Sequence, residues 1–208
     1  MKAPSKKPSL FIAALYLAIS MFTADAVAGL PTDQIKATVD KALVVLKDPR
    51  FKPPAKQRER RDHLKQILFA RFDFAEMAKR SLGADWRRRT PQEQEDFVRL
   101  FTEVIERAYA DIIESYTNEK IVYVHEKVDG NYADVYSKIV TAKGEEYTIN
   151  YKAQLAGSDW KVYDVVAENV SLVNNYRSQF TRVNSKSSYE ELVRRLRDKS
   201  EFTGAPKK

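Results

Sequence analysis

The feature that most constrains this fold is a change in the period of the apolar residues near position 118. Before that point apolar residues recur every three or four positions, as they do along one face of a helix. Between about residues 119 and 169 they alternate with polar residues, which is typical of half-buried strands. After about residue 170 the helical period returns. Helices and strands that are segregated along the chain in this way predict an α+β fold.

The alternating region predicts a four-stranded antiparallel meander, because short turns join its stretches. The turns are Asp129-Gly130-Asn131, Lys143-Gly144 and Gly157-Ser158-Asp159. Each strand carries apolar residues on one side and polar or charged residues on the other, so we expect a curved sheet with one buried face. The expected strands cover residues 120–128, 132–142, 145–157 and 160–169.

The helical regions, residues 30–118 and 170–203, predict three or four helices before the strands and two after them. The longest, residues 90–116, begins with a capping box formed by Thr90 and Glu93. Its apolar stripe is too wide for one neighbour to cover, so we expect it to pack on one face of the sheet. The last helix begins with a second candidate capping box, formed by Ser187 and Glu190.

The first 28 residues are expected to be a leader and not part of the fold. Three lysines precede an apolar run of about 13 residues, and "ADAVA" then offers small residues for cleavage. The run is shorter than the roughly 18 residues that a membrane-spanning helix needs. The sequence therefore predicts a cleaved secretory signal peptide, residues 1–28, and a mature domain, residues 29–208. A retained membrane anchor is the alternative.

Export changes what the positive charge of the chain implies. A formal net charge of +7 and a pI near 9.4 would suggest nucleic acid as the partner of a cytosolic protein. Outside the cytosol, a modest positive charge better suits anionic lipid headgroups or acidic protein patches, and no nucleic-acid partner is expected. The run Arg87, Arg88 and Arg89 precedes a helix N-terminus, and we hypothesise that it docks on acidic surfaces. A solvated loop is the alternative.

The sequence offers little for metal binding or catalysis. It has no cysteine, and neither of its two histidines, His63 and His125, has a second histidine at ligand spacing. No phosphate-binding glycine loop or G-x-S-x-G motif is present, and we expect neither a metal nor a cofactor. Asp164 and His125 are the only candidates for an acid or base in an apolar pocket.

Glu168 and Asn169 stand between two apolar runs, where the last strand meets the next helix. We interpret them as residues that fix a strand-to-helix corner or contact a protein partner. Ser171 follows closely, where a hydroxyl can satisfy free amide donors of the helix.

Two segments of the chain resemble the MlaC family. The first is "RFDFAEMAKRSLGADW", with F-D-F, M-A, L-G and W between Phe72 and Trp86; the second is "AENVSLVNNYR", Ala167–Arg177. With the long helix and the strands between them, the resemblance extends from about Leu30 to Phe202. Members of this family are periplasmic phospholipid-binding proteins, also called toluene-tolerance proteins or auxiliary components of ABC transporters.

The resemblance implies a soluble periplasmic carrier of phospholipid. Its implied partners are an outer-membrane lipoprotein complex and an inner-membrane ABC transporter complex with a substrate-binding component of the MCE type. The implied fold has a sheet like that of nuclear transport factor 2 (NTF2-like) and a helical subdomain, with the acyl chains between sheet and helices. A related branch is associated with hopanoid synthesis, so a hopanoid-associated lipid is an alternative cargo.

From this role and the excess of apolar residues we predict a cavity lined by the long helix and the sheet. The predicted lipid-binding residues are Phe97, Phe101, Ile105, Tyr109, Ile113, Val135, Ile139, Ile149, Tyr151, Tyr163 and Val165. Two other classes of protein fit the same pattern. One is an NTF2-like periplasmic enzyme with an apolar substrate pocket, and the other is an adaptor with a solid core.

Overall fold

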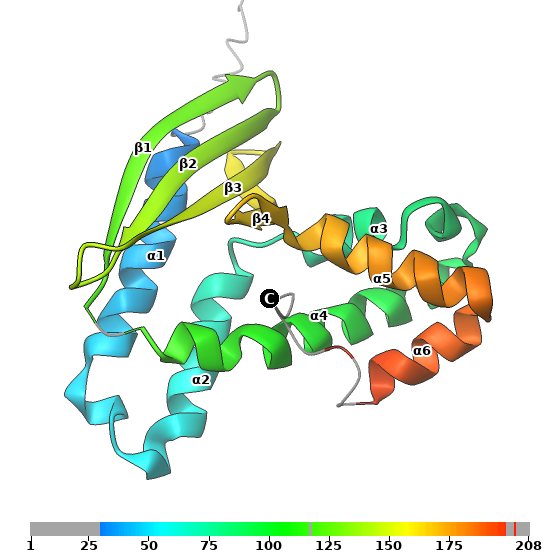
Figure 1. Ribbon diagram of the computed structural model, residues 1–208, viewed down its shortest axis with the longest axis horizontal. Helices are drawn as coiled ribbons and strands as arrows, with labels where there is room; N and C mark the ends of the chain where they lie inside the picture. The colour runs from blue at the N-terminus through cyan, green and yellow to red at the C-terminus, as the bar shows by residue number, and fades with distance from the viewer. Residues whose placement is uncertain (1–29, 117, 199–201, 203–208) are drawn as a thin grey trace, which may run out of the picture.

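A computed structural model of the chain describes residues 30–116, 118–198 and 202 (Figure 1). The predicted leader, residues 1–28, lies outside these residues. The helices are α1 (Pro31–Lys47), α2 (Gln57–Phe69), α3 (Phe74–Leu82), α4 (Pro91–Glu114), α5 (Leu172–Lys186) and α6 (Tyr189–Arg197). The strands are β1 (Lys120–Asp129), β2 (Tyr132–Val140), β3 (Glu146–Ala156), β4 (Asp159–Ala167) and β5 (Val170–Ser171).

The predicted α+β class and antiparallel meander are confirmed, but the sheet has five strands, in the order β1-β2-β3-β4-β5. The additional strand arises at Glu168 and Asn169, which have left-handed φ values of 48° and 64°. Two consecutive residues with positive φ form a tight hairpin turn, so the chain pairs with β4 again before α5 begins. The expected corner from strand to helix is therefore a hairpin followed by a helix.

One face of the sheet, the inner face, is covered by α1 and not by the long helix α4, which corrects the expected packing. Ile35 of α1 is buried against Val135, Ala153 and Val162 of the sheet. Figure 1 shows α1 lying along the sheet at one end of the molecule, and α3, α5 and α6 grouped with the first part of α4 at the other end. From there α4 runs back toward α1 and α2. The first core of the protein is thus the contact between α1 and the sheet.

A second core lies within the group of four helices. Phe97 and Phe101 of α4 pack edge-to-face against Phe180 of α5, with ring centroids 5.6 and 6.2 Å apart. The buried members of this helical core come from all four helices and residue 202; among them are Met77, Phe97, Phe101, Val104, Tyr176, Phe180, Leu192, Leu196 and Phe202. The apolar stripe of α4 is therefore covered by other helices as far as Ile105.

Residues 71–73 and Asp164 join the two cores. The amide of Asp73 donates to the carbonyl of Val162 over 2.8 Å, and the Val162 amide donates to the Arg71 carbonyl over 2.9 Å. Phe72, between them, packs against both cores. Asp164 of β4 accepts hydrogen bonds from Ser171 and from the amide of Val173 at the start of α5. The segment before α3 and the start of α5 are thus fixed to the sheet.

Two capping predictions have different outcomes. The Thr90–Glu93 capping box is confirmed, since each side chain bonds the backbone amide of the other residue. At α6 the N-cap is Ser188, whose hydroxyl accepts from the Glu191 amide, so the predicted box of Ser187 and Glu190 is wrong by one residue. Both serines and both glutamates fit the motif, and only the packing of α6 selects between them.

Candidate functional site

The strand register places the predicted sheet residues on the inner face. Val135 lies opposite Tyr151, and Tyr151 lies opposite Val165. Ile139 follows Val135 by four positions and Ile149 precedes Tyr151 by two, so both point to the same side. Val135 is buried against α1, whereas the other four remain half-buried.

The predicted residues of α4 divide into two groups. Phe97, Phe101 and Ile105 are buried in the helical core, and the two phenylalanines are 0% exposed. Tyr109 and Ile113, one and two turns further on, are only half-buried. The structure therefore does not bring the whole predicted set together along one surface, because protein side chains already cover its most buried members.

Tyr163 lies at an irregularity in β4, next to Val162 and Asp164. The Arg80 guanidinium is 4.1 Å from its ring centroid, and the ring of Tyr132 meets it edge-on at 6.2 Å. Other side chains thus occupy two sides of this ring.

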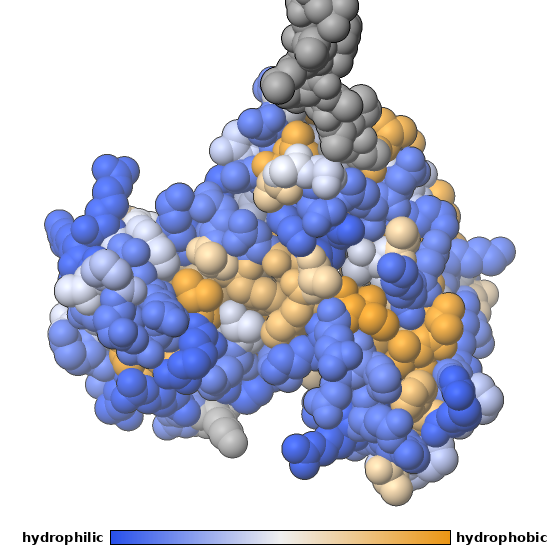
Figure 2. Space-filling view, turned by 180° about the vertical axis from the view of Figure 1, so that it is seen from behind, coloured by the Kyte–Doolittle hydropathy of each residue, from blue (hydrophilic) through white to orange (hydrophobic). Residues whose placement is uncertain are grey.

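Six of the predicted residues remain half-buried without such a stack, and we call them the half-buried set. They are Tyr109, Ile113, Ile139, Ile149, Tyr151 and Val165. Seen from behind, apolar surface forms a band across the middle of the molecule, between hydrophilic regions (Figure 2). An open, shallow hollow on α1 is lined by Asp40, Leu43, Val44, Lys47 and Asp48. Partly exposed apolar surface of this kind can bind an apolar ligand. Contact of the half-buried set with lipid stays a prediction.

Sequence reasoning missed the contribution of α1 and of the segment before α3. Val39 and Tyr123 pack against the sheet core while remaining half-buried, and Phe72 and Phe74 do the same at the helical core. The F-D-F motif could have pointed to Phe72 and Phe74 as functional residues. For Val39, the helical period identified the apolar side of α1, but it did not show that this side packs on the sheet.

The inner face of the sheet carries two polar hydroxyl groups, those of Tyr123 and Tyr151. The hydroxyl oxygen of Tyr123 is buried and has no hydrogen-bond partner among the described residues. Its pKa is raised, first by burial and then by the neighbouring Tyr151 and Asp40. Burial also raises the pKa of Tyr151 to about 12, an effect that Ser137 opposes. Both phenols therefore stay protonated and can act as hydrogen-bond donors.

An ionic cluster joins α2 to the half-buried end of α4. The Glu114 carboxylate, only 7% exposed, contacts Arg60 at 3.1 Å and Arg61 at 2.8 Å. Burial acts to raise the pKa of Glu114, but hydrogen bonds from Arg61 and Gln57 and the two positive charges lower it below its usual range. The carboxylate is thus held ionised between the two helices.

The two candidates for acid–base chemistry do not form a site. The Asp164 carboxylate is buried, and its two hydrogen bonds serve the start of α5. His125 is exposed and stacks on Tyr136 at 4.1 Å. They lie on β4 and β1, which are three strand spacings, about 14 Å, apart.

Glu168, the charged residue at the hairpin turn, holds the turn against strand β3. Its amide donates to the Thr148 carbonyl over 3.1 Å, and its carboxylate accepts from the amide and the hydroxyl of Thr148. These bonds extend the pairing of β3 with β4 beyond the strand end.

The basic run before α4 is not uniform. The Arg89 guanidinium lies over the Tyr189 ring, 4.4 Å from its centroid, and pairs with Glu93. Arg88 is exposed and pairs with Asp85 at 3.2 Å, while Arg87 is exposed. Only the first two arginines are available to a partner.

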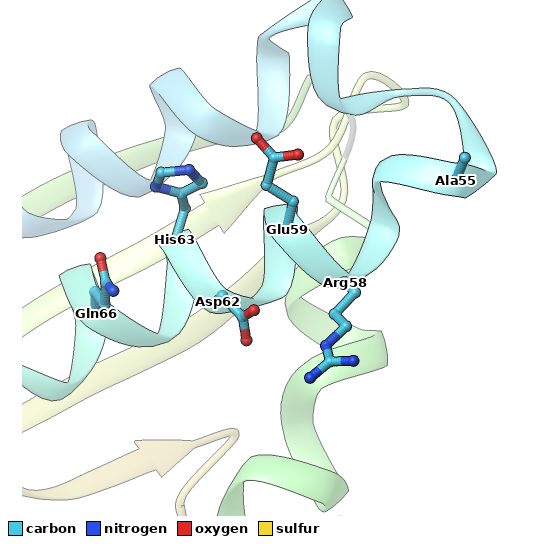
Figure 3. Close-up of a pocket in the computed structure, with 6 residues that line it drawn as sticks. All are labelled: Ala55, Arg58, Glu59, Asp62, His63 and Gln66. Carbon is cyan, nitrogen blue, oxygen red and sulfur yellow. The ribbon is translucent and has the colours of Figure 1, made fainter.

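A shallow polar hollow on α2 does not form a metal site. Figure 3 shows Glu59 and His63 on one side of the helix and Arg58 and Asp62 on another, so these groups do not converge. Within the described residues, no group of three or more metal-ligating side chains occurs. The helices that the structure describes also include none long and apolar enough to cross a membrane.

Comparisons with known proteins agree on one family. The family model described as "MlaC protein" matches residues 36–198. The chain is 28% identical over 120 residues to "Intermembrane phospholipid transport system binding protein MlaC" of Haemophilus influenzae, covering 55% of this chain and 56% of that relative. It is 25% identical over 152 residues to "Toluene tolerance protein ttg2D" of Pseudomonas putida, covering 72% and 71%. The first alignment therefore spans just over half of the relative.

The fold also matches a solved structure. It is a phospholipid-binding protein from Ralstonia solanacearum in complex with a phospholipid. The TM-score is 0.71 and the identity 26%, and the match covers 81% of this chain and 96% of that one.

Proposed function

Because this chain belongs to the MlaC family, whose model matches residues 36–198, we propose that it is a carrier that binds phospholipid by its acyl chains. The observation that carries the proposal is the match to nearly the whole of a chain that holds a phospholipid. The half-buried set supports it, since it offers apolar side chains that the protein covers only in part.

The physical need for such a carrier follows from the cost of wetting acyl chains. Each methylene exposed to water costs about 0.8 kcal/mol, so one 16-carbon chain costs on the order of 12 kcal/mol. Spontaneous exit from a membrane is correspondingly slow. A carrier must offer an apolar surface nearly as favourable as the bilayer, and needs no reactive group.

We place this carrier in the periplasm, exported by the leader predicted at residues 1–28. Its partners would be the outer-membrane lipoprotein complex and the inner-membrane ABC transporter complex with its MCE-type component. The proposal also includes an NTF2-like relationship for the sheet, and a helical subdomain formed by residues 30–118 and 170–203. The curved meander with α1 across its inner face is consistent with that relationship.

The enzyme alternative is less favoured, because Asp164 is committed to α5 and His125 is exposed on a distant strand. No observation favours a hopanoid over a phospholipid. Both possibilities are outcomes of the same experiment.

Mass spectrometry of a solvent extract of the purified protein tests the proposed function. We expect phospholipid in a fixed molar ratio to protein. If a hopanoid is found in its place, the carrier function holds but the proposed cargo is wrong. Protein that contains no lipid, and takes none from vesicles, would refute the carrier function.

A further inference from the structure

The inner face of the sheet carries one polar cluster among apolar side chains. Tyr123 of β1 lies opposite Ser137 of β2, and Tyr151 of β3 is two residues from the other partner of Ser137, Ile149. Ser137 is short and donates its hydroxyl proton to the carbonyl of Ile149. Two long phenol side chains therefore flank a short one, and Tyr151 is close enough to Tyr123 to help raise its pKa.

Among the residues that the structure describes, the hydroxyl of Tyr123 has no hydrogen-bond partner. A buried phenol normally finds a hydrogen-bond partner, and leaving a buried polar group without one costs about 1–3 kcal/mol. The surrounding side chains that pack on this core include Val39 and Val165, which accept no hydrogen bond. A ligand seated on the half-buried set would have to supply the acceptor.

The chemistry of the site selects among the acceptors of a phospholipid. Acyl chains fit the apolar neighbours, and the first oxygen atoms met at the end of an acyl chain are those of its ester. A phosphate is disfavoured, because the hydroxyl of Tyr123 is buried next to an apolar core, where an unpaired charge is costly. A neutral carbonyl meets a smaller penalty.

We propose that the hydroxyl of Tyr123, with Tyr151 beside it, donates a hydrogen bond to an ester carbonyl oxygen of the bound lipid. The inference rests on the proposed function and deepens it, since it names the part of the lipid that the protein recognises. The carrier therefore selects ester-linked lipids over ether-linked lipids of the same headgroup.

The test uses competition between two lipids that differ only in these carbonyls. Purified protein is incubated with vesicles containing equal amounts of diacyl phosphatidylethanolamine and its dialkyl ether analogue, and the lipids recovered with the protein are quantified. We expect the wild type to prefer the diacyl lipid by about two- to tenfold for each hydrogen bond. Tyr123→Phe should lower this ratio, and Tyr123→Phe with Tyr151→Phe should bring it close to one.

Tyr132→Phe is the matched control, because Tyr132 is exposed and the alternation of β2 places it on the other face. It should keep the wild-type ratio. A second measurement is the stability of lipid-depleted protein. Since the Tyr123 hydroxyl lacks a partner, Tyr123→Phe should be at least as stable as the wild type.

Four results would count against the idea, in different ways. Uptake of both lipids in equal amounts by the wild type, or an unchanged ratio in Tyr123→Phe, would overturn the ester contact and leave the carrier intact. A clear loss of stability in lipid-depleted Tyr123→Phe would show that the hydroxyl has a partner within the protein or its bound water, which also overturns the inference. Uptake of neither lipid by the wild type would instead refute the proposed function.

Discussion

The two halves of α4 carry one continuous apolar stripe but are buried to very different extents. Phe97 and Phe101, in the first half, are enclosed by aromatic side chains of the neighbouring helices. Tyr109 and Ile113, in the second half, are half-buried, and Ile112 between them is exposed. Ionic and polar contacts join α2 to this second half, at Glu106, Asp111 and Glu114.

The sheet shows the same division. Val135 is 0% exposed beneath α1, whereas Ile149 on the next strand is half-buried. In both places protein side chains enclose one group of residues completely and the other group only in part. We infer that the first group mainly determines stability and that the second group mainly determines lipid binding. The first two predictions below each change one member of each group.

The largest expected difference is between arginine at position 135 and arginine at position 149. Val135→Arg places an unpaired charge in a closed core, which costs several kcal/mol and should unfold the domain. Ile149→Arg should stay folded, because its long side chain can reach water, and it should displace lipid from the half-buried set. Thermal unfolding and lipid content, measured on both variants, test the difference.

Two outcomes would contradict this prediction. If Ile149→Arg is folded and carries the full amount of lipid, Ile149 is not a lipid contact. If both variants unfold, the inner face is one closed core and the division we describe does not exist there.

Truncations on α4 should give the next largest difference. Phe101→Ala should lower the free energy of unfolding by about 3–5 kcal/mol, since it leaves a cavity in the helical core. Ile113→Ala should lower it by less than about 1 kcal/mol in lipid-depleted protein, because solvent already reaches this side chain. Urea unfolding measures both values. Similar losses from the two variants would show that both halves of α4 are equally packed.

The sequence predicted the elements of this fold better than their contacts. Period identifies which side of a helix or strand is apolar, and it correctly grouped the inner-face residues Val135, Ile149 and Tyr151. It does not identify the neighbour that covers that side. We therefore assigned the inner face to α4, whereas the helix that covers it, α1, is separated from the sheet by some 70 residues.

Other differences between the predicted and the observed structure arise where the sequence allows two local conformations of similar energy. Glu168 and Asn169 adopt left-handed φ values without a glycine, so the hairpin they form has no strong local signal. For the candidate site, the composition predicted apolar contacts, but the division of α4 depends on where α5 and α6 pack. The spacing of apolar residues along the sequence does not show where α5 and α6 pack on α4.

The ionic cluster at Glu114 should make the contact between α2 and α4 sensitive to pH. Because the folded-state pKa of Glu114 is lowered, its contribution to stability is fully present above its ordinary value of 4.5 and is lost as pH falls through the lower folded value. Glu114→Gln should lower the urea midpoint at pH 7. The gap between wild type and variant should then narrow below about pH 4.5.

Glu106→Gln is the matched control, because the pair of Glu106 with Lys65 joins the same two helices but is much more exposed. Exposed pairs contribute about 0–1 kcal/mol, so the urea midpoint of this variant should hardly change. An equal effect from both variants at every pH would show that the burial of Glu114 has no special importance.

The smallest expected effect concerns the two available arginines before α4. We predict that Arg87→Ser with Arg88→Ser slows lipid exchange with anionic vesicles by about twofold at low ionic strength, because fewer positive charges attract the protein to the surface. The difference should disappear at high salt, since charges further apart than about 8–10 Å are screened at 0.1–0.15 M. Arg89 is left unchanged, because its contacts with Tyr189 and Glu93 support the fold.

Lys52→Ser with Arg58→Ser removes the same charge from exposed positions near the start of α2 and serves as the control. If the control slows exchange as much, net charge and not this corner governs docking; if neither variant slows it at low salt, Arg87 and Arg88 are only solvated surface.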